Sequence, residues 1–138
     1  MKKLLIDTNI IIDLLAKREP FYNEAAQLFT LADKNIIQLS VSSLTFANTN
    51  YILLQSKKPD EAKLILRKLK LIVQILSLNE KVVGLSLNDN DFKDFEDALQ
   101  YFSAIENEVD IIITRNLKDF QKAKIPVMTA AQFLKTIK

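Results

Sequence analysis

The chain has 138 residues, of which 49% are hydrophobic and 26% are charged, and its formal net charge is +2. This length and composition predict one globular domain, residues 1–138, around one core. Cys and His are both absent, which excludes disulfides, thiolate nucleophiles, His-based triads and most transition-metal sites. Any catalysis must therefore use carboxylates, Lys, Tyr or hydroxyl groups, or a hard cation held by oxygen.

The apolar runs are too short to span a membrane. The first of them is also interrupted by Asp7, Asn9 and Asp13, which argues against a signal peptide. We therefore expect a cytoplasmic protein with no membrane partner. The small positive net charge permits a polyanionic partner without requiring one.

The stretch from Leu4 to Leu15 combines a short aliphatic run, a carboxylate and a second apolar run. Residues 4–6 are typical of a strand buried on both faces of a parallel sheet. Asp7 follows at the end of this strand, where α/β sheets bind ligands. Residues 7–9 are equally suited to capping the next helix without any other function. The β-branched residues 10–12 leave the boundary between strand and helix open.

Hydrophobic periodicity and turn residues predict the remaining elements. Strands are expected over 37–42, 73–78, 111–114 and 125–128, and helices over 21–32, 44–54, from 60 onward, 80–87, 94–108 and 130–137. Residues 44–54 are apolar nearly all round, so we expect that helix to be buried. The bases between 63 and 70 are interpreted first as a solvated helix face and second as a nucleic-acid surface. The alternation of strands and helices predicts an α/β fold with a parallel sheet of about five strands.

Acidic and amide side chains recur after two of the aliphatic strands. Asp7 follows the first strand, and Asn116 and Asp119 follow the strand that ends at residue 114. Asp94 and Asp97 could cap their helix, but Asp97 could also reach the same edge of the sheet. Several carboxylates in one pocket need a cation, and oxygen ligands select Mg²⁺ or Mn²⁺. Such a metal could activate water for attack on a phosphodiester, which suits a chain without His.

Four segments, in this order, resemble the PIN-domain family of metal-dependent ribonucleases, which includes many toxins of bacterial toxin–antitoxin pairs. They are Leu5–Asn9, Val41–Asn48, Asp94–Leu99 and Ile113–Phe120, and the resemblance runs from about residue 4 to residue 133. It implies an α/β/α sandwich, a homodimer, an acidic metal pocket and RNA as the substrate.

The resemblance also assigns roles to individual residues. It implies that Asp7, Asp97 and Asp119 are catalytic, and that Asp7, Asp97, Asp94, Asn116 and Asn48 surround Mg²⁺ or Mn²⁺. Thr8, Asn9 and Arg115 are expected to contact the substrate phosphate. Asn48 stands where the family usually has Glu, and Asn116 where it usually has Asp. These two amides lack the negative charge of the usual acids and put activity in doubt.

The sequence leaves several functions open. The favoured hypothesis is a metal-dependent endoribonuclease that acts as a toxin with a cognate antitoxin. The main alternative is a catalytically weak or inactive PIN-like domain that binds RNA or a protein partner. A phosphatase of the haloacid dehalogenase kind would need a second Asp two residues after Asp7, where this chain has Asn9. A helical antitoxin or a receiver-type signalling domain completes the alternatives.

Overall fold

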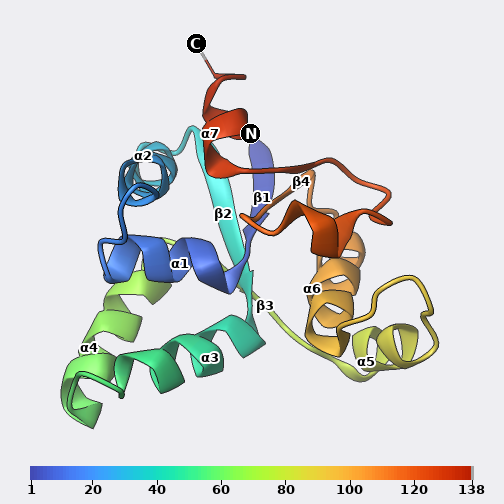
Figure 1. The fold of residues 1–138 in the computed structure, drawn as a ribbon, viewed down its shortest axis with the longest axis horizontal. Helices are drawn as coiled ribbons and strands as arrows, with labels where there is room; N and C mark the ends of the chain where they lie inside the picture. Colours follow the sequence, from blue (N-terminus) through green and yellow to red (C-terminus); the bar gives the residue numbers. More distant parts are fainter. Residues whose placement is uncertain (138) are drawn as a thin grey trace.

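A five-stranded parallel sheet forms the centre of the computed structural model, which describes residues 1–137 (Figure 1). The strand order is β3-β2-β1-β4-β5, and every neighbouring pair is parallel. The strands are β1 (Lys2–Ile6), β2 (Ile37–Ser42), β3 (Gln74–Leu76), β4 (Ile111–Ile113) and β5 (Val127–Met128). The predicted α/β fold with about five parallel strands is confirmed.

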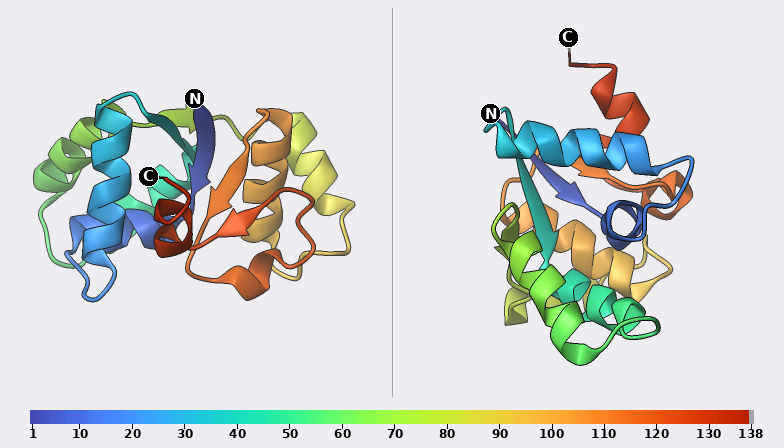
Figure 2. Two further views of the ribbon diagram at one scale, coloured as in Figure 1. Left: turned by 90° about the horizontal axis from the view of Figure 1, so that it is seen from above. Right: turned by 90° about the vertical axis from the view of Figure 1, so that its left-hand side faces the viewer.

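Helices cover both faces of the sheet. They are α1 (Thr8–Leu15), α2 (Tyr22–Asp33), α3 (Ser43–Leu53), α4 (Pro59–Lys70), α5 (Glu80–Leu87), α6 (Phe95–Glu106) and α7 (Ala130–Leu134), with a 3-10 turn, η1 (Leu117–Phe120). Figure 1 and the left view of Figure 2 show α1 and α2 on one side of the sheet and α5 and α6 on the other. The predicted α/β/α sandwich is therefore present. No helix within residues 1–137 has the length and apolar character that a membrane crossing requires.

The central strands are buried on both faces, as their uninterrupted apolar runs predict. Leu4 and Ile6 of β1 belong to the core shared with α1, α2 and α7. Leu5 points to the opposite face and joins Ile112 in the core beneath α6. Leu5 and Ile112 are also register partners in the sheet. Burial on two faces fixes the register of β1 and β4, because a shift by one residue would exchange their faces.

Helix α1 resolves the ambiguity left by its three isoleucines. Ile10, Ile11 and Ile12 are helical and buried. Asp7 is the N-cap residue, and its side chain accepts a hydrogen bond from the Thr8 backbone N–H. Capping and packing against the sheet therefore outweigh the strand preference of β-branched residues.

Residues 44–54 were predicted to form a buried helix. The helix is present, but the prediction that it is buried is wrong. Thr45, Thr49 and Leu53 form the buried stripe of α3, whereas Tyr51 is 71% and Leu54 42% exposed. The reason is position, because α3 packs against α1, α4 and β2 and is covered on one side only.

Three other predictions need correction. Strand β3 spans only residues 74–76, and β5 only 127–128. Helix α7 ends at Leu134, where the chain turns, rather than at Ile137.

We predict that Leu5→Ala lowers the free energy of unfolding by about 2–5 kcal/mol, because it leaves a cavity between β1 and α6. Leu87→Ala is the matched control, since Leu87 is 68% exposed and its loss should change stability by less than about 0.5 kcal/mol. Urea unfolding of both variants measures the difference. Equal effects of the two substitutions would contradict the two-face burial of β1.

Candidate active site

Asp7 is held at the carboxyl end of β1 by hydrogen-bond donors. Its Oδ1 accepts from the Thr8 backbone N–H at 2.7 Å and from Gln100 Nε2 at 3.0 Å. Its Oδ2 accepts from Thr114 Oγ1 at 2.8 Å and from Asn9 Nδ2 at 3.4 Å. Hydrogen bonds to a carboxylate are stronger than those between neutral groups. Asp7 is only 8% exposed, so its two oxygens have a fixed orientation.

Asp7 forms one wall of a cleft of about 450 Å³ at the carboxyl edge of the sheet. The other walls come from α3, the first turns of α6, and the segment that follows β4. The cleft contains all but one of the predicted site residues: Asp7, Thr8, Asn9, Asn48, Asp94, Asp97, Asn116 and Asp119. Residues more than 100 positions apart in the sequence thus meet in one place.

The carboxylates of the cleft influence one another strongly. The pKa of Asp97 is raised to about 7, first by burial and then by the negative charges of Asp94, Asp119, Asp7 and Glu96, in that order of importance. Asp97 lies in the first turn of α6, whose N-cap is Asp94. Asp94 Oδ1 accepts from the Glu96 backbone N–H at 2.8 Å, so Asp94 caps the helix as well as lining the cleft. A cation in this cleft would relieve the repulsion among these acids.

The cleft offers oxygen donors for such a cation without a complete set of acidic ligands. Among residues 1–137, no group of three or more acidic side chains is arranged to hold a metal ion as it stands. Two amide oxygens in the cleft, Asn9 Oδ1 and Gln100 Oε1, are buried and have no hydrogen-bond partner. Mg²⁺ commonly takes only one or two protein carboxylates and completes its shell with water and substrate oxygens. The donor chemistry of the cleft fits that kind of hard cation.

Asn48 and Asn116, the two amides that replace the usual acids, both line the cleft. Asn116 is tied to the strand end, because its backbone N–H donates to Thr114 Oγ1 at 3.0 Å. Its carbonyl accepts from the Asp119 backbone N–H at 3.0 Å, which begins the turn η1. Thr114 therefore connects Asp7 with the segment that carries Asn116 and Asp119.

Sequence reasoning missed Gln100 and Thr114, although both bind Asp7. Gln100 is 6% exposed and lies among the apolar residues of α6. A buried amide one turn after Asp97 was a usable signal, because buried polar groups need partners. Thr114 was assigned to the strand and thereby overlooked as the residue beside Asp7.

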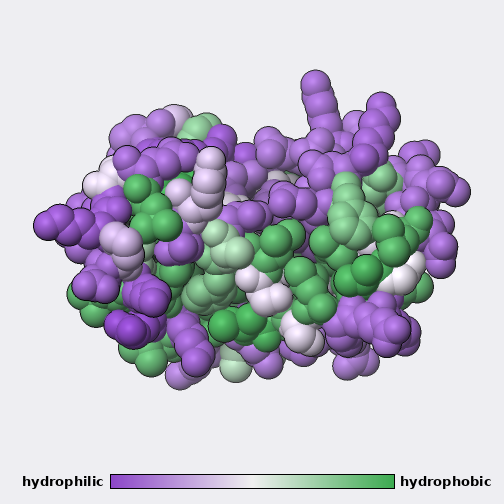
Figure 3. Space-filling view, turned by 90° about the horizontal axis from the view of Figure 1, so that it is seen from below, coloured by the Kyte–Doolittle hydropathy of each residue, from purple (hydrophilic) through white to green (hydrophobic). Residues whose placement is uncertain are grey.

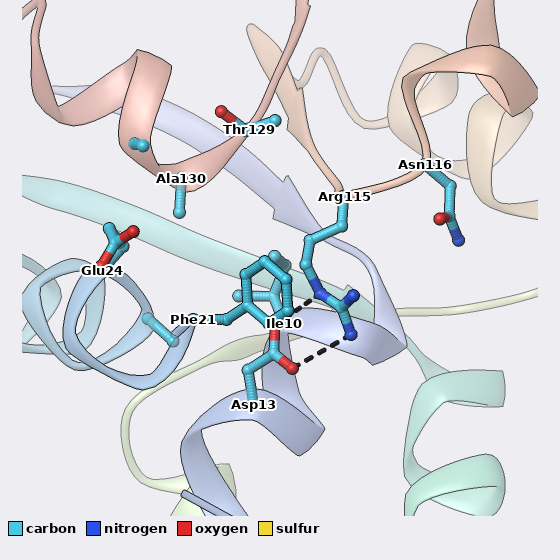
Figure 4. Close-up of a pocket in the computed structure, with 10 residues that line it drawn as sticks. Ile10, Asp13, Phe21, Glu24, Arg115, Asn116, Thr129 and Ala130 are labelled. Carbon is cyan, nitrogen blue, oxygen red and sulfur yellow. Dashed lines mark hydrogen bonds and ion pairs between the residues drawn. The ribbon is translucent and has the colours of Figure 1, made fainter. Parts of the chain in front are cut away.

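Arg115 is the one predicted site residue that does not line the cleft. Figure 4 shows its side chain beside Asp13 and Phe21. Its Nε and Nη2 donate to Asp13 Oδ2 and Oδ1 at 2.8 and 3.1 Å, and its guanidinium lies 4.1 Å from the centre of the Phe21 ring. Asp13 is 1% exposed, so it requires a counter-charge inside the protein. The structure therefore gives Arg115 a buried carboxylate as its partner, and both line a neighbouring cavity of about 300 Å³ that shares Asn116 with the cleft.

The raised pKa keeps Asp97 protonated in the folded protein at pH values where the same residue is ionised in the unfolded chain. Asp97 therefore contributes stability that is complete below about pH 4. That stability is lost as pH rises through about 7. We predict that Asp97→Asn, in EDTA, is more stable than the wild type by about 1–2 kcal/mol at pH 8, after allowance for solvent screening. The difference should vanish toward pH 4. Urea unfolding across this range measures the difference, and a pH-independent difference would contradict the raised pKa of Asp97.

We predict that Arg115→Met lowers the free energy of unfolding by about 3 kcal/mol or more, because it leaves the Asp13 charge buried and unpaired. The double variant Asp13→Leu with Arg115→Met should recover most of that loss. Lys81→Met is the control, since the ion pair of Lys81 with Glu106 is exposed and should contribute at most about 1 kcal/mol. Urea unfolding of the complete cycle gives the coupling energy, and a value near zero would refute this role.

Comparison with known proteins identifies the family of the chain. A family model described as a PIN domain matches residues 3–118. The chain is 30% identical over 139 aligned positions to the protein named Ribonuclease VapC1 from Aquifex aeolicus (strain VF5), covering 96% of this chain and 93% of that one.

Solved structures share the fold. A toxin–antitoxin complex from Klebsiella pneumoniae contains a chain with 26% identity and a TM-score of 0.69, covering 92% of this chain and 97% of that one. FitAcB from Neisseria gonorrhoeae contains one with 17% identity and a TM-score of 0.70, covering 93% of this chain and 98% of that one. Because the PIN model spans most of the sequence, the chain belongs to the PIN-domain family.

Proposed function

We propose that this protein is an endoribonuclease that hydrolyses RNA phosphodiesters and acts as the toxin of a toxin–antitoxin pair. One observation carries the proposal: Asp7, Asp97 and Asp119 come from three separate segments and line the same cleft. The relative named a ribonuclease supports the reaction, and the toxin–antitoxin complex from Klebsiella pneumoniae supports the biological role.

We propose that Mg²⁺ or Mn²⁺ is the cofactor. Asp7 and Asp97 would hold it, with Asp94, Asn116 and Asn48 as further oxygen donors from the walls of the cleft. Such an ion, when bound, activates water and neutralises charge on the phosphate.

The remaining side chains orient the site. The donors around Asp7 fix the direction of its carboxylate, as outer-shell partners of metal ligands commonly do. We propose that Thr8 and Asn9, which line the cleft beside Asp7, contact the substrate phosphate. Arg115 would act through its neighbour: its ion pair with Asp13 holds the segment that places Asn116 in the cleft.

A second candidate is a PIN domain with little or no catalysis that binds RNA or a protein. The specific observation in its favour is that amides, Asn48 and Asn116, stand at two positions where the family usually has acids. Each amide can offer an oxygen to a cation but no charge. Affinity for the metal distinguishes the two candidates.

We further propose a protein antitoxin as partner, a homodimer in solution, and a cytoplasmic location, where the RNA substrates are found. Figure 3 shows apolar side chains exposed on the side of the molecule where α3 and α5 lie. Exposed apolar residues of the chain include Tyr51, Leu54, Leu71, Ile75 and Leu87. Exposed apolar area of this kind favours association with another protein surface.

We predict that Asp7→Asn lowers metal-dependent cleavage of a mixed RNA pool by at least about 100-fold, since it removes the charge of the best-fixed oxygen ligand. Circular dichroism should show that the fold survives. Asp33→Asn is the matched control, because Asp33 is exposed at the end of α2 that leads into the start of β2.

Cleavage should also stop in EDTA and return with Mg²⁺ or Mn²⁺. Full activity of the Asp7 variant would refute the assignment of the site. Absence of both cleavage and Mn²⁺ binding at millimolar metal in the wild type would favour the non-catalytic candidate.

A further inference from the structure

A second groove, of about 380 Å³, adjoins the acidic cleft on the side of α6 and η1. It shares Asp94, Asp97 and Asp119 with the cleft, so the two hollows meet at these acids. Both volumes lie within the range of about 300–1,000 Å³ that is usual for ligand pockets. In Figure 1 the turn η1, near residue 120 of the colour bar, lies beside α6. The residues that line the groove belong to these two elements and to the segments next to them.

Three lysines line this groove. Lys93 belongs to the segment that precedes α6, Lys118 to η1, and Lys122 to the turn that follows it. All three are exposed. Within residues 1–137 the ion pairs are Lys81 with Glu106 and Arg115 with Asp13, so none of the three lysines is paired with a carboxylate. Their charges are therefore available to an anion from solution.

The arrangement of the charges favours a chain of phosphates over a single anion. The three shared acids line both hollows, at the place where a cation would be held. The three lysines line only the groove, where Asp91 is the one further acid. If the lysines served only to neutralise the acids, they would form ion pairs with them. The backbone phosphates that follow the cleaved phosphate along an RNA strand would bind in such a groove.

We propose that Lys93, Lys118 and Lys122 form a binding track for the backbone of single-stranded RNA, placing the nucleotides next to the cleaved phosphate between α6 and η1. This inference rests on the proposed ribonuclease function and adds the path of the substrate. Contacts of this kind fix position on the backbone and read no sequence. Binding along the track should therefore depend on salt and little on base composition.

The test compares two triple variants of equal charge change. The track variant carries Lys93→Gln, Lys118→Gln and Lys122→Gln. The control carries Lys63→Gln, Lys68→Gln and Lys70→Gln, all exposed on α4. The probe is a fluorescein-labelled mixed-sequence RNA of about 20 nucleotides, long enough to exceed a single-strand site of roughly 4–16 nucleotides. Fluorescence anisotropy in EDTA, which prevents cleavage, gives the affinity over a series of KCl concentrations.

The track variant should reduce the slope of log affinity against log salt by about 2, since each lost single-strand phosphate contact removes about 0.7. The control should keep the wild-type slope. With metal present, the track variant should raise KM for the RNA while kcat changes little, because the lysines bind substrate away from the reacting phosphate.

Four results would overturn the inference. Equal slopes for the track variant and the wild type would show that the lysines do not contact RNA. A larger loss in the α4 control would place the RNA on α4 instead. If the wild type cleaves RNA and the track variant keeps its KM, the track fails while the ribonuclease function stands. If the wild type neither binds nor cleaves RNA, both proposals fail together.

Discussion

The fixed position of the Asp7 carboxylate is the interaction on which the site depends. Its donors come from α1, α6 and the residue after β4, so one side chain joins three parts of the fold. The sheet register makes this possible. Ile6 pairs with Ile113, and the Asp7 backbone N–H donates to the Ile113 carbonyl at 3.0 Å, which places Thr114 beside Asp7. Since two-face burial sets that register, the apolar core determines the geometry of the polar site.

The cleft gathers like charges at a cost in stability. Asp97 is partly buried among other carboxylates, and its burial and then their repulsion raise its pKa. The fold opposes this cost with buried apolar strands beneath the cleft and with the Asp13–Arg115 ion pair beside it. A protein selected for stability alone would place these acids apart, because uncompensated like charges destabilise a fold. Their convergence therefore supports the proposed binding of a cation and a phosphate.

Much of the architecture followed from pattern and position in the chain. Leu4–Ile6 and Ile111–Ile113 are continuous apolar runs, and such runs identify the centre of a parallel sheet. Side-chain partners did not follow in the same way. Arg115 was expected to contact phosphate, yet it is bound to Asp13, and Tyr51 was expected inside a buried helix that proves to be covered on one side only. Both outcomes depend on which segments pack together, and local periodicity does not encode that.

The sequence by itself determined the order of the strands and helices along the chain and the placement of Asp7 and Asp119 after aliphatic strands. It also restricted any metal ligands to oxygen atoms, because the chain has no His or Cys. These properties are local, and each depends on a few neighbouring residues. Only the tertiary structure decided that Gln100 and Thr114 hold Asp7, that Arg115 neutralises Asp13, and that three lysines line a groove beside the acids. The reason is distance along the chain: these contacts join segments that meet only when the sheet and its helices are assembled.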